Sequence, residues 1–177
     1  MRGQMLGGRP ATAIALAGLI VAAGFAPGAA SEPPAVAVFD FELVDTSLEG
    51  ELAGASDAER ARLRLIGDLL RAEIARSGRF RVIDAGPATR ETIGGRIRRT
   101  CNGCELPVAA GLGADFALIG WVQKVSNLIL NINVAVREVG SGRLATGASV
   151  DIRGNTDEAW SRGARNLVRH QLLGGPR

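Results

Sequence analysis

The stretch that decides the fold is residues 113–154, GADFALIGWVQKVSNLILNINVAVREVGSGRLATGASVDIRG, which predicts three consecutive β-strands joined by two tight turns. In the middle strand, apolar and polar or small residues alternate with a period of two, as in a strand with one buried face. One face carries Leu128, Leu130, Ile132, Val134 and Val136, and the other carries Ile129, Asn131, Asn133, Ala135 and Arg137.

The two turns predict how the three strands pair. Ser126-Asn127 suits a two-residue hairpin turn, because Asn tolerates a positive φ, and it pairs Trp121 with Ile132 on the apolar face. The second turn is Gly140-Ser141-Gly142. The apolar faces of the two strands that it joins coincide only if the residue numbers of each pair add up to an even number. That register places Asn133 beside Ser149 and Asn131 beside Asp151. We expect the core anchors to be Trp121, Ile132, Val134 and, from the last helix, Trp160.

The opposite face of this sheet is a candidate binding face. Asn is disfavoured within strands, so two Asn residues at alternate positions need an explanation. A hydrated sheet face or a polar network under a covering loop would provide one, and so would a site for a small ligand or a carbohydrate. The candidate residues on this face and at the nearby strand ends are Asn131, Asn133, Ser149, Asp151, Arg153 and Lys124.

Toward the N-terminus, the pattern predicts a strand, a helix and a second strand. Residues 35–43, AVAVFDFEL, form the first predicted strand, and residues 44–55 form a loop rich in Gly, Ser and acidic residues. Ser56 and Glu59 fit a capping box that starts a helix reaching about Ser77. Residues 79–84 then form a strand, and strand–helix–strand with a helix of this length indicates a right-handed parallel crossover.

The remaining elements complete a single α/β domain over residues 31–177. Residues 105–112 predict a short helix, and Asn155 or Thr156 can cap a final helix that contains Trp160. The predicted architecture is a mixed sheet of about five strands, ending in an antiparallel three-strand meander, with helices packed mainly on one face.

The first thirty residues resemble a cleavable signal peptide. Arg2 and Arg9 precede an uncharged apolar run over residues 11–25, and small residues lead to a cleavage site near Ala30. The run is shorter than the ~20 residues that span a bilayer. We therefore expect a periplasmic or secreted chain with no stable membrane anchor after cleavage. Cleavage leaves 19 basic and 18 acidic residues, so the charge does not indicate a nucleic-acid partner.

Cys101 and Cys104 are the two cysteines of the chain. In an exported chain an isolated pair most simply forms a disulfide. A redox pair remains an alternative, because Cys104 precedes a helix. A metal site would need more ligands than the pair and the single His170 provide, so we predict no metal and no cofactor. We find no catalytic constellation, so we expect a non-enzymatic protein.

Four segments carry a resemblance: VAVFDFELVDTSLEGE (36–51), CNGCE (101–105), LGADFALIGWVQKVSNLILNINV (112–134) and DIRGNTDEAWSRG (151–163). They resemble a family of predicted secreted bacterial proteins that carries a domain-of-unknown-function label. The order of the elements is also similar to the N-terminal domain of TolB and related envelope assembly modules. This similarity implies an accessory module of the cell envelope that binds a protein partner.

Overall fold

The computed structural model describes residues 32–88 and 98–174, so the predicted signal peptide lies outside the described residues. Five strands follow the order β3-β1-β4-β5-β6, and β2 also pairs with β4. The strands are β1 Ala35–Val38, β2 Glu42–Asp45, β3 Arg81–Asp84, β4 Phe116–Ser126, β5 Ile129–Glu138 and β6 Leu144–Ile152. The helices are α1 Leu48–Ala53, α2 Asp57–Arg76, α4 Glu105–Gly111 and α5 Asp157–Asn166, with a 3-10 helix, η1 Arg98–Thr100, and a π-helix, η2 Leu167–Leu172, that follows α5. The predicted mixed α/β fold is confirmed.

Helix α2 forms the predicted parallel crossover between β1 and β3. The Ser56 hydroxyl accepts a hydrogen bond from the Glu59 backbone N–H, and the Glu59 carboxylate accepts one from the Ser56 backbone N–H, so the capping box is present. After α2 ends, Gly78 has a φ of +66°, a conformation that costs glycine little. Strand β3 then pairs with β1 in parallel.

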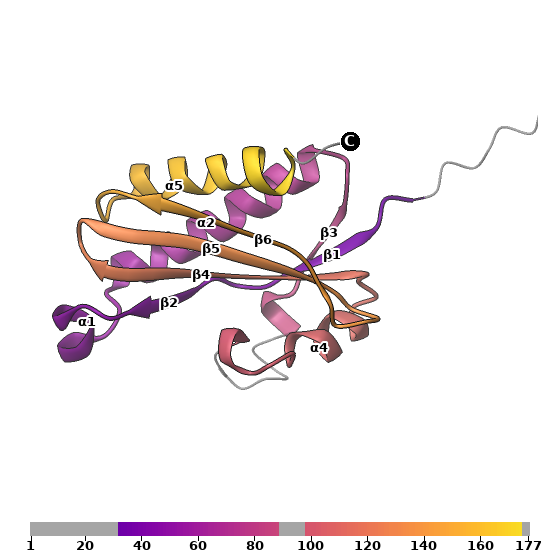
Figure 1. Ribbon diagram of the computed structural model, residues 1–177, viewed down its shortest axis with the longest axis horizontal. Coiled ribbons are helices and arrows are strands. Elements are labelled where there is room, and N and C mark those ends of the chain that lie inside the picture. Colours follow the sequence, from indigo (N-terminus) through magenta and orange to yellow (C-terminus); the bar gives the residue numbers. More distant parts are fainter. Residues whose placement is uncertain (1–31, 89–97, 175–177) are drawn as a thin grey trace, which may run out of the picture. The chain divides into compact units, whose positions relative to one another are not determined.

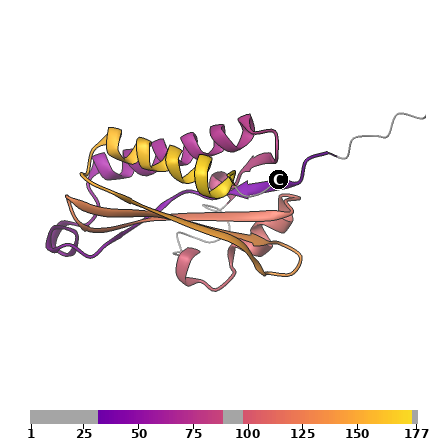
Figure 2. The ribbon, with the colours of Figure 1, turned by 45° about the horizontal axis from the view of Figure 1, so that its top comes forward.

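The helices cover both faces of the sheet unequally. Helices α2 and α5 lie side by side on one face, and α4 lies on the other (Figures 1 and 2). The main apolar cluster lies between the sheet and the α2–α5 layer and contains Ile132, Val134 and Trp160. A second cluster packs α4 against Phe39, Ala117 and Ile119.

The single strand predicted over residues 35–43 is wrong, because the strand is interrupted at Phe39–Phe41 and continues as a separate strand, β2. Val38 pairs with Leu118 and Glu42 pairs with Trp121. Between these two pairs the chain advances by four residues from β1 to β2 but by only three residues along β4. This extra residue acts like a β-bulge and turns Phe39 and Phe41 toward opposite apolar clusters. The Phe41 ring lies over Gly120, where any Cβ would collide with it.

The predicted register of the first hairpin is also wrong. The turn lies at Asn127-Leu128, and Val125 is an extra residue between the Lys124–Leu130 and Ser126–Ile129 pairs. Trp121 therefore pairs with Asn133 instead of Ile132. Since adjacent residues of a strand point to opposite faces, Trp121 leaves the α2–α5 face and is half-buried rather than a core anchor.

The predicted register of the second hairpin is confirmed. Asn133 pairs with Ser149 and Asn131 pairs with Asp151. Strand β6 is an edge strand, and the Gln171 side chain covers its edge at Ser149. Gln171 Oε1 accepts the Ser149 N–H at 3.1 Å, and its Nε2 donates to the Ser149 carbonyl at 2.9 Å. The carboxamide thus takes the place of a neighbouring peptide group.

Candidate functional site

A short helix, α1, occupies the segment for which the sequence predicted a loop. The Ser47 side chain caps α1 by accepting the Gly50 N–H at 3.1 Å. Leu48 and Leu52, four residues apart, share one face of the helix. A Ser before two leucines at this spacing was the available sequence signal. Gly50 and the acidic residues of this segment favour a loop and outweigh that signal.

Helix α1 and the β4–β5 turn lie at the same end of the sheet (Figure 1), and both carry exposed apolar side chains. Leu48 and Leu52 are 71% and 79% exposed, and Leu128 is 72% exposed. Among the described residues, five of the seven exposed large hydrophobic side chains lie at this end. The five define the apolar end surface: Leu48, Leu52, Val125, Leu128 and Ile129.

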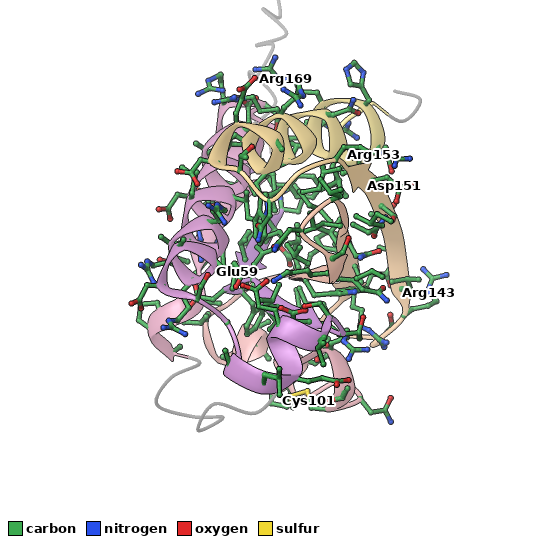
Figure 3. All side chains as sticks on the ribbon, turned by 90° about the vertical axis from the view of Figure 1, so that its left-hand side faces the viewer. Glu59, Cys101, Arg143, Asp151, Arg153 and Arg169 are labelled. Carbon is green, nitrogen blue, oxygen red and sulfur yellow. A yellow bond between two sulfur atoms is a disulfide. The ribbon has the colours of Figure 1, made fainter. Side chains whose placement is uncertain are left out.

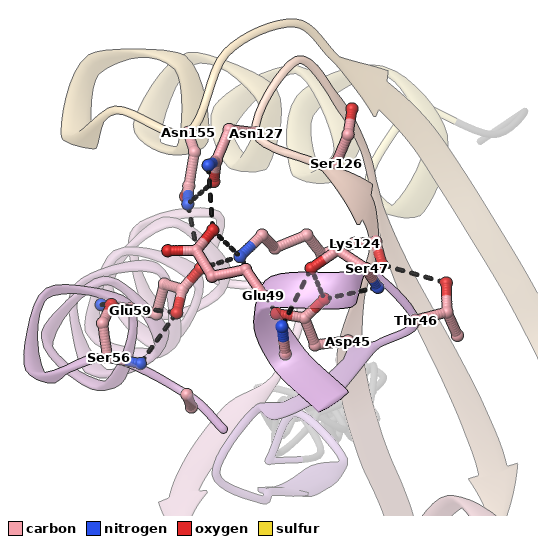
Figure 4. A network of polar contacts seen from close by, with 12 residues as sticks. Asp45, Thr46, Ser47, Glu49, Ser56, Glu59, Lys124, Ser126, Asn127 and Asn155 are labelled. Carbon is pink, nitrogen blue, oxygen red and sulfur yellow. Dashed lines mark hydrogen bonds and ion pairs between the residues drawn. The ribbon is translucent and has the colours of Figure 1, made fainter. Parts of the chain in front are cut away.

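Lys124 lies beneath this surface and joins three carboxylates. Its side chain is 1% exposed. Its Nζ lies 2.7 Å from Glu59 of α2, 2.9 Å from Asp45 of β2 and 3.4 Å from Glu49 of α1. The prediction that Lys124 belongs to the polar binding face is therefore wrong: the register of β4 turns it toward α2 (Figure 4). We call Lys124 and these three carboxylates the Lys124 hub.

Further hydrogen bonds connect the hub to the β4–β5 turn and to the start of α5. The Asn155 amide donates to Glu59 Oε1 at 2.9 Å and to Asn127 Oδ1 at 3.0 Å. The Asn127 amide donates to Glu49 Oε2 at 3.0 Å, and the Trp160 indole N–H donates to Asn155 Oδ1 at 3.1 Å. These contacts hold α1 and the turn in one arrangement (Figure 4).

The start of α1 is fixed by the end of β2. Asp45 Oδ1 accepts hydrogen bonds from the Ser47 N–H at 2.9 Å and the Ser47 hydroxyl at 2.6 Å. Gly50 lies so close to the Asp45 carboxylate that no Cβ could be placed there. The apolar end surface is thus carried by backbone that buried charges hold in place.

Burial and ion pairing act in opposite directions on the hub's pKa values. Burial alone would raise the pKa of Glu59, but hydrogen bonds from Lys124, Ser56 and Asn155 lower it from 4.5 to about 2. Burial would likewise lower the pKa of Lys124, and the Glu59 and Asp45 carboxylates raise it instead. The charged forms of both groups are therefore favoured in the folded protein.

The lowered pKa of Glu59 predicts a loss of stability in acid. The unfolded chain binds a proton at Glu59 near pH 4.5, whereas the folded protein binds it only near pH 2. The stabilisation is therefore fully present above pH 4.5 and is lost as the pH falls toward 2. We expect the difference in unfolding free energy between wild type and Glu59→Gln to shrink by about 3 kcal/mol over this range. Urea denaturation at several pH values measures it, and identical pH profiles would contradict it.

The structure brings together most of the predicted polar face. The Asn131 amide donates to Asp151 Oδ1 at 2.7 Å, and its Oδ1 accepts the Ser149 hydroxyl at 2.9 Å. The Asn133 amide lies 3.5 Å from the Asn131 carbonyl. Asp151 and Arg153 lie on the β6 side of the molecule (Figure 3). Many hydrogen-bonding groups on this face thus bond to one another. A ligand-binding role for this face stays a prediction.

A second charged group lies at the carboxyl ends of β1 and β3, where open α/β sheets often bind ligands. Arg71 of α2 lies 2.9 Å from Asp40, 3.1 Å from Asp68 and 3.0 Å from Asp84. Its side chain is 15% exposed. These ion pairs join α2 to the strand ends, and they give Arg71 a structural role.

The predicted disulfide between Cys101 and Cys104 is present, with the Cα atoms 5.5 Å apart. This distance is within the range typical of disulfides. Both cysteines are half-buried, and Cys104 immediately precedes α4. Within the described residues, no helix is long and apolar enough to cross a membrane.

The fold and the site define a class: an α/β domain with one mixed sheet, helices on both faces and an exposed apolar end. The chain belongs to the family described as "Protein of unknown function (DUF2380)", whose model matches residues 34–172. The predicted resemblance to such a family is confirmed. No curated protein matches the chain.

Several solved structures are similar to the chain. E. coli LpoB, determined by NMR, has a TM-score of 0.52 and 13% identity over 70% of this chain and 58% of LpoB. The PelC dodecamer from Paraburkholderia phytofirmans has a TM-score of 0.48 and 14% identity, covering 77% of this chain and 83% of PelC. TolB from Acinetobacter baumannii has a TM-score of 0.45 and 10% identity, covering 82% of this chain and 29% of TolB. At these identities the similarity concerns the fold and not the function.

Proposed function

We propose that this chain is an exported, non-enzymatic accessory module of the bacterial cell envelope that binds a protein partner through its apolar end surface. One observation carries the proposal: five exposed large hydrophobic side chains gather at one end of the sheet. A group of exposed apolar side chains at one end of a protein commonly marks an interaction site. The sequence features of the first thirty residues support export, and the disulfide suits an oxidising compartment.

The charges beside the surface describe the partner. Glu49 is 60% exposed, and Glu51 is also exposed on α1. The single lysine, Lys124, is buried and neutralised beneath them. A protein that presents apolar side chains flanked by Arg or Lys complements this surface. An anionic lipid surface does not, because the acidic residues would repel it.

Site-specific photo-crosslinking in the native cell envelope tests the proposal. A photoreactive residue replaces Leu52 in one variant and Leu128 in a second. We expect both variants to give the same discrete crosslinked species, because the two positions would face one partner. Adding Leu48→Asp to either variant should abolish that species, since it places a charge in the centre of the interface.

Leu144 provides a matched control. It is 57% exposed, but it begins β6 next to the β5–β6 turn, at the other end of the strands. A photoreactive residue there should not give the species. The proposal fails if all three positions give the same species, or if Leu52 and Leu128 give none.

A further inference from the structure

Glu105 is a buried acidic residue beside the disulfide. It is 1% exposed, although it lies in the first turn of α4. Its Oε2 lies 3.8 Å from Cys101 Sγ, and its Oε1 lies 3.5 Å from Arg137 Nε. Burial of a carboxylate is unfavourable unless hydrogen bonds compensate it. In the disulfide, the sulfur next to Glu105 has no proton to donate.

We propose that Cys101 and Cys104 are a redox-active pair that exchanges two electrons with a dithiol, and that Glu105 takes up and returns the proton of Cys101. The proposal is independent of the partner-binding surface. It adds thiol–disulfide exchange to the non-enzymatic binding role proposed above, and it rests on the position of a buried carboxylate next to one sulfur of a half-buried disulfide.

The exchange balances in two steps. A thiolate of the substrate dithiol attacks one sulfur, the Cys101–Cys104 bond breaks, and a mixed disulfide forms. The second substrate thiolate then attacks the mixed disulfide, so the substrate leaves as a disulfide and the chain holds two thiols. Two electrons and two protons pass from the substrate to the chain. In the reverse direction, Glu105 accepts the proton of Cys101 and leaves the thiolate, which is the attacking form.

Glu105 also favours the reduced state. Once reduced, Cys101 can donate an S–H hydrogen bond to the carboxylate, and such charge-assisted bonds are stronger than neutral ones. The oxidised pair cannot make this bond. The reduced form therefore gains an interaction that the disulfide lacks. The pair is then easier to reduce than a structural disulfide, which resists reduction by glutathione.

Equilibration with glutathione buffers and the rate of reduction by dithiothreitol test the proposal on the full chain. In wild type, we expect oxidised and reduced forms to coexist within the accessible glutathione ratios. Glu105→Met removes both the acceptor and the proton site, and it should shift the equilibrium constant about tenfold toward the disulfide. Glu105→Gln keeps an acceptor oxygen but takes no proton and offers only a neutral hydrogen bond, so it should slow exchange about tenfold or more and shift the equilibrium less than Glu105→Met does.

Glu73→Gln is the matched control. Glu73 is another carboxylate held by arginines, Arg169 at 3.0 Å and Arg76 at 2.9 Å, and it lies on α2, away from the disulfide. It should behave as wild type in both measurements. The proposal is overturned if the pair stays oxidised at every glutathione ratio. It is also overturned if both Glu105 variants match Glu73→Gln, since the disulfide is then only structural. Because Glu105→Gln preserves the shape of the side chain, it decides the matter even if Glu105→Met folds poorly.

Discussion

Replacing Lys124 by methionine is expected to lower the free energy of unfolding by about 3–5 kcal/mol, because it removes one partner of a buried ion pair and leaves the others. Glu59 and Asp45 have side chains that are only 3% and 8% exposed. Without the ammonium, both carboxylates remain buried without their cation. Urea denaturation near neutral pH, with circular dichroism as the signal, measures the loss.

Arg143→Met provides the control for Lys124→Met. Arg143 pairs with Glu138 at 2.8 Å, but its side chain is 75% exposed, so we expect a loss of less than about 1 kcal/mol. If the two variants lose equal stability, the hub does not stabilise the fold. A second measurement concerns the surface itself: amide hydrogen exchange over residues 48–53 should accelerate in Lys124→Met, because Glu49 and Asp45 no longer fix α1.

Replacing Trp160 by alanine is expected to cost about 3–5 kcal/mol, because the indole is fully buried and its removal leaves a cavity. The change also removes the N–H donor to Asn155, which in turn contacts Glu59 of the Lys124 hub. For a domain of this size, the melting temperature should fall by on the order of 10 °C. Differential scanning calorimetry gives both quantities.

Trp121→Ala is the comparison that tests the register. Trp121 is half-buried and lies outside both apolar clusters, so we expect a loss of at most about 2 kcal/mol. The register predicted from the sequence would make the two tryptophans equivalent core anchors. Equal losses in Trp121→Ala and Trp160→Ala would therefore support that register and contradict the one described here.

Local signals predicted the elements whose ends depend on nearby residues. The Ser56–Glu59 capping box located the start of α2, and the alternation in residues 128–136 located β5. The pairing of β5 with β6 followed from placing their apolar residues on one face, which requires that the residue numbers of each pair add up to an even number. The disulfide followed from two cysteines three residues apart in a chain with an export-type N-terminus.

The candidate site was largely beyond such signals, because its residues come from separate elements. Asp45, Glu49, Glu59 and Lys124 are spread over β2, α1, α2 and β4. Each side chain, taken alone, is an ordinary charged residue that is expected at the surface. Only their convergence on one buried ammonium explains why Lys124, Glu59 and Asp45 are buried, and why α1 is held with its leucines outward.

The sequence alone determined most of the elements, the meander in residues 113–154 and the existence of an apolar and a polar face, but it did not predict α1 or the division of the first strand into β1 and β2. The tertiary structure alone decided which side chain belongs to which face. Val125 adds one residue to β4, and the break at Phe39–Phe41 adds one to the strand beside it. A shift of one residue sends every side chain of a strand to the opposite face. Because of such shifts, Trp121 lies outside the core and Lys124 lies within it. Packing against α2 selects the register of β4, and the residue pattern of the turn does not.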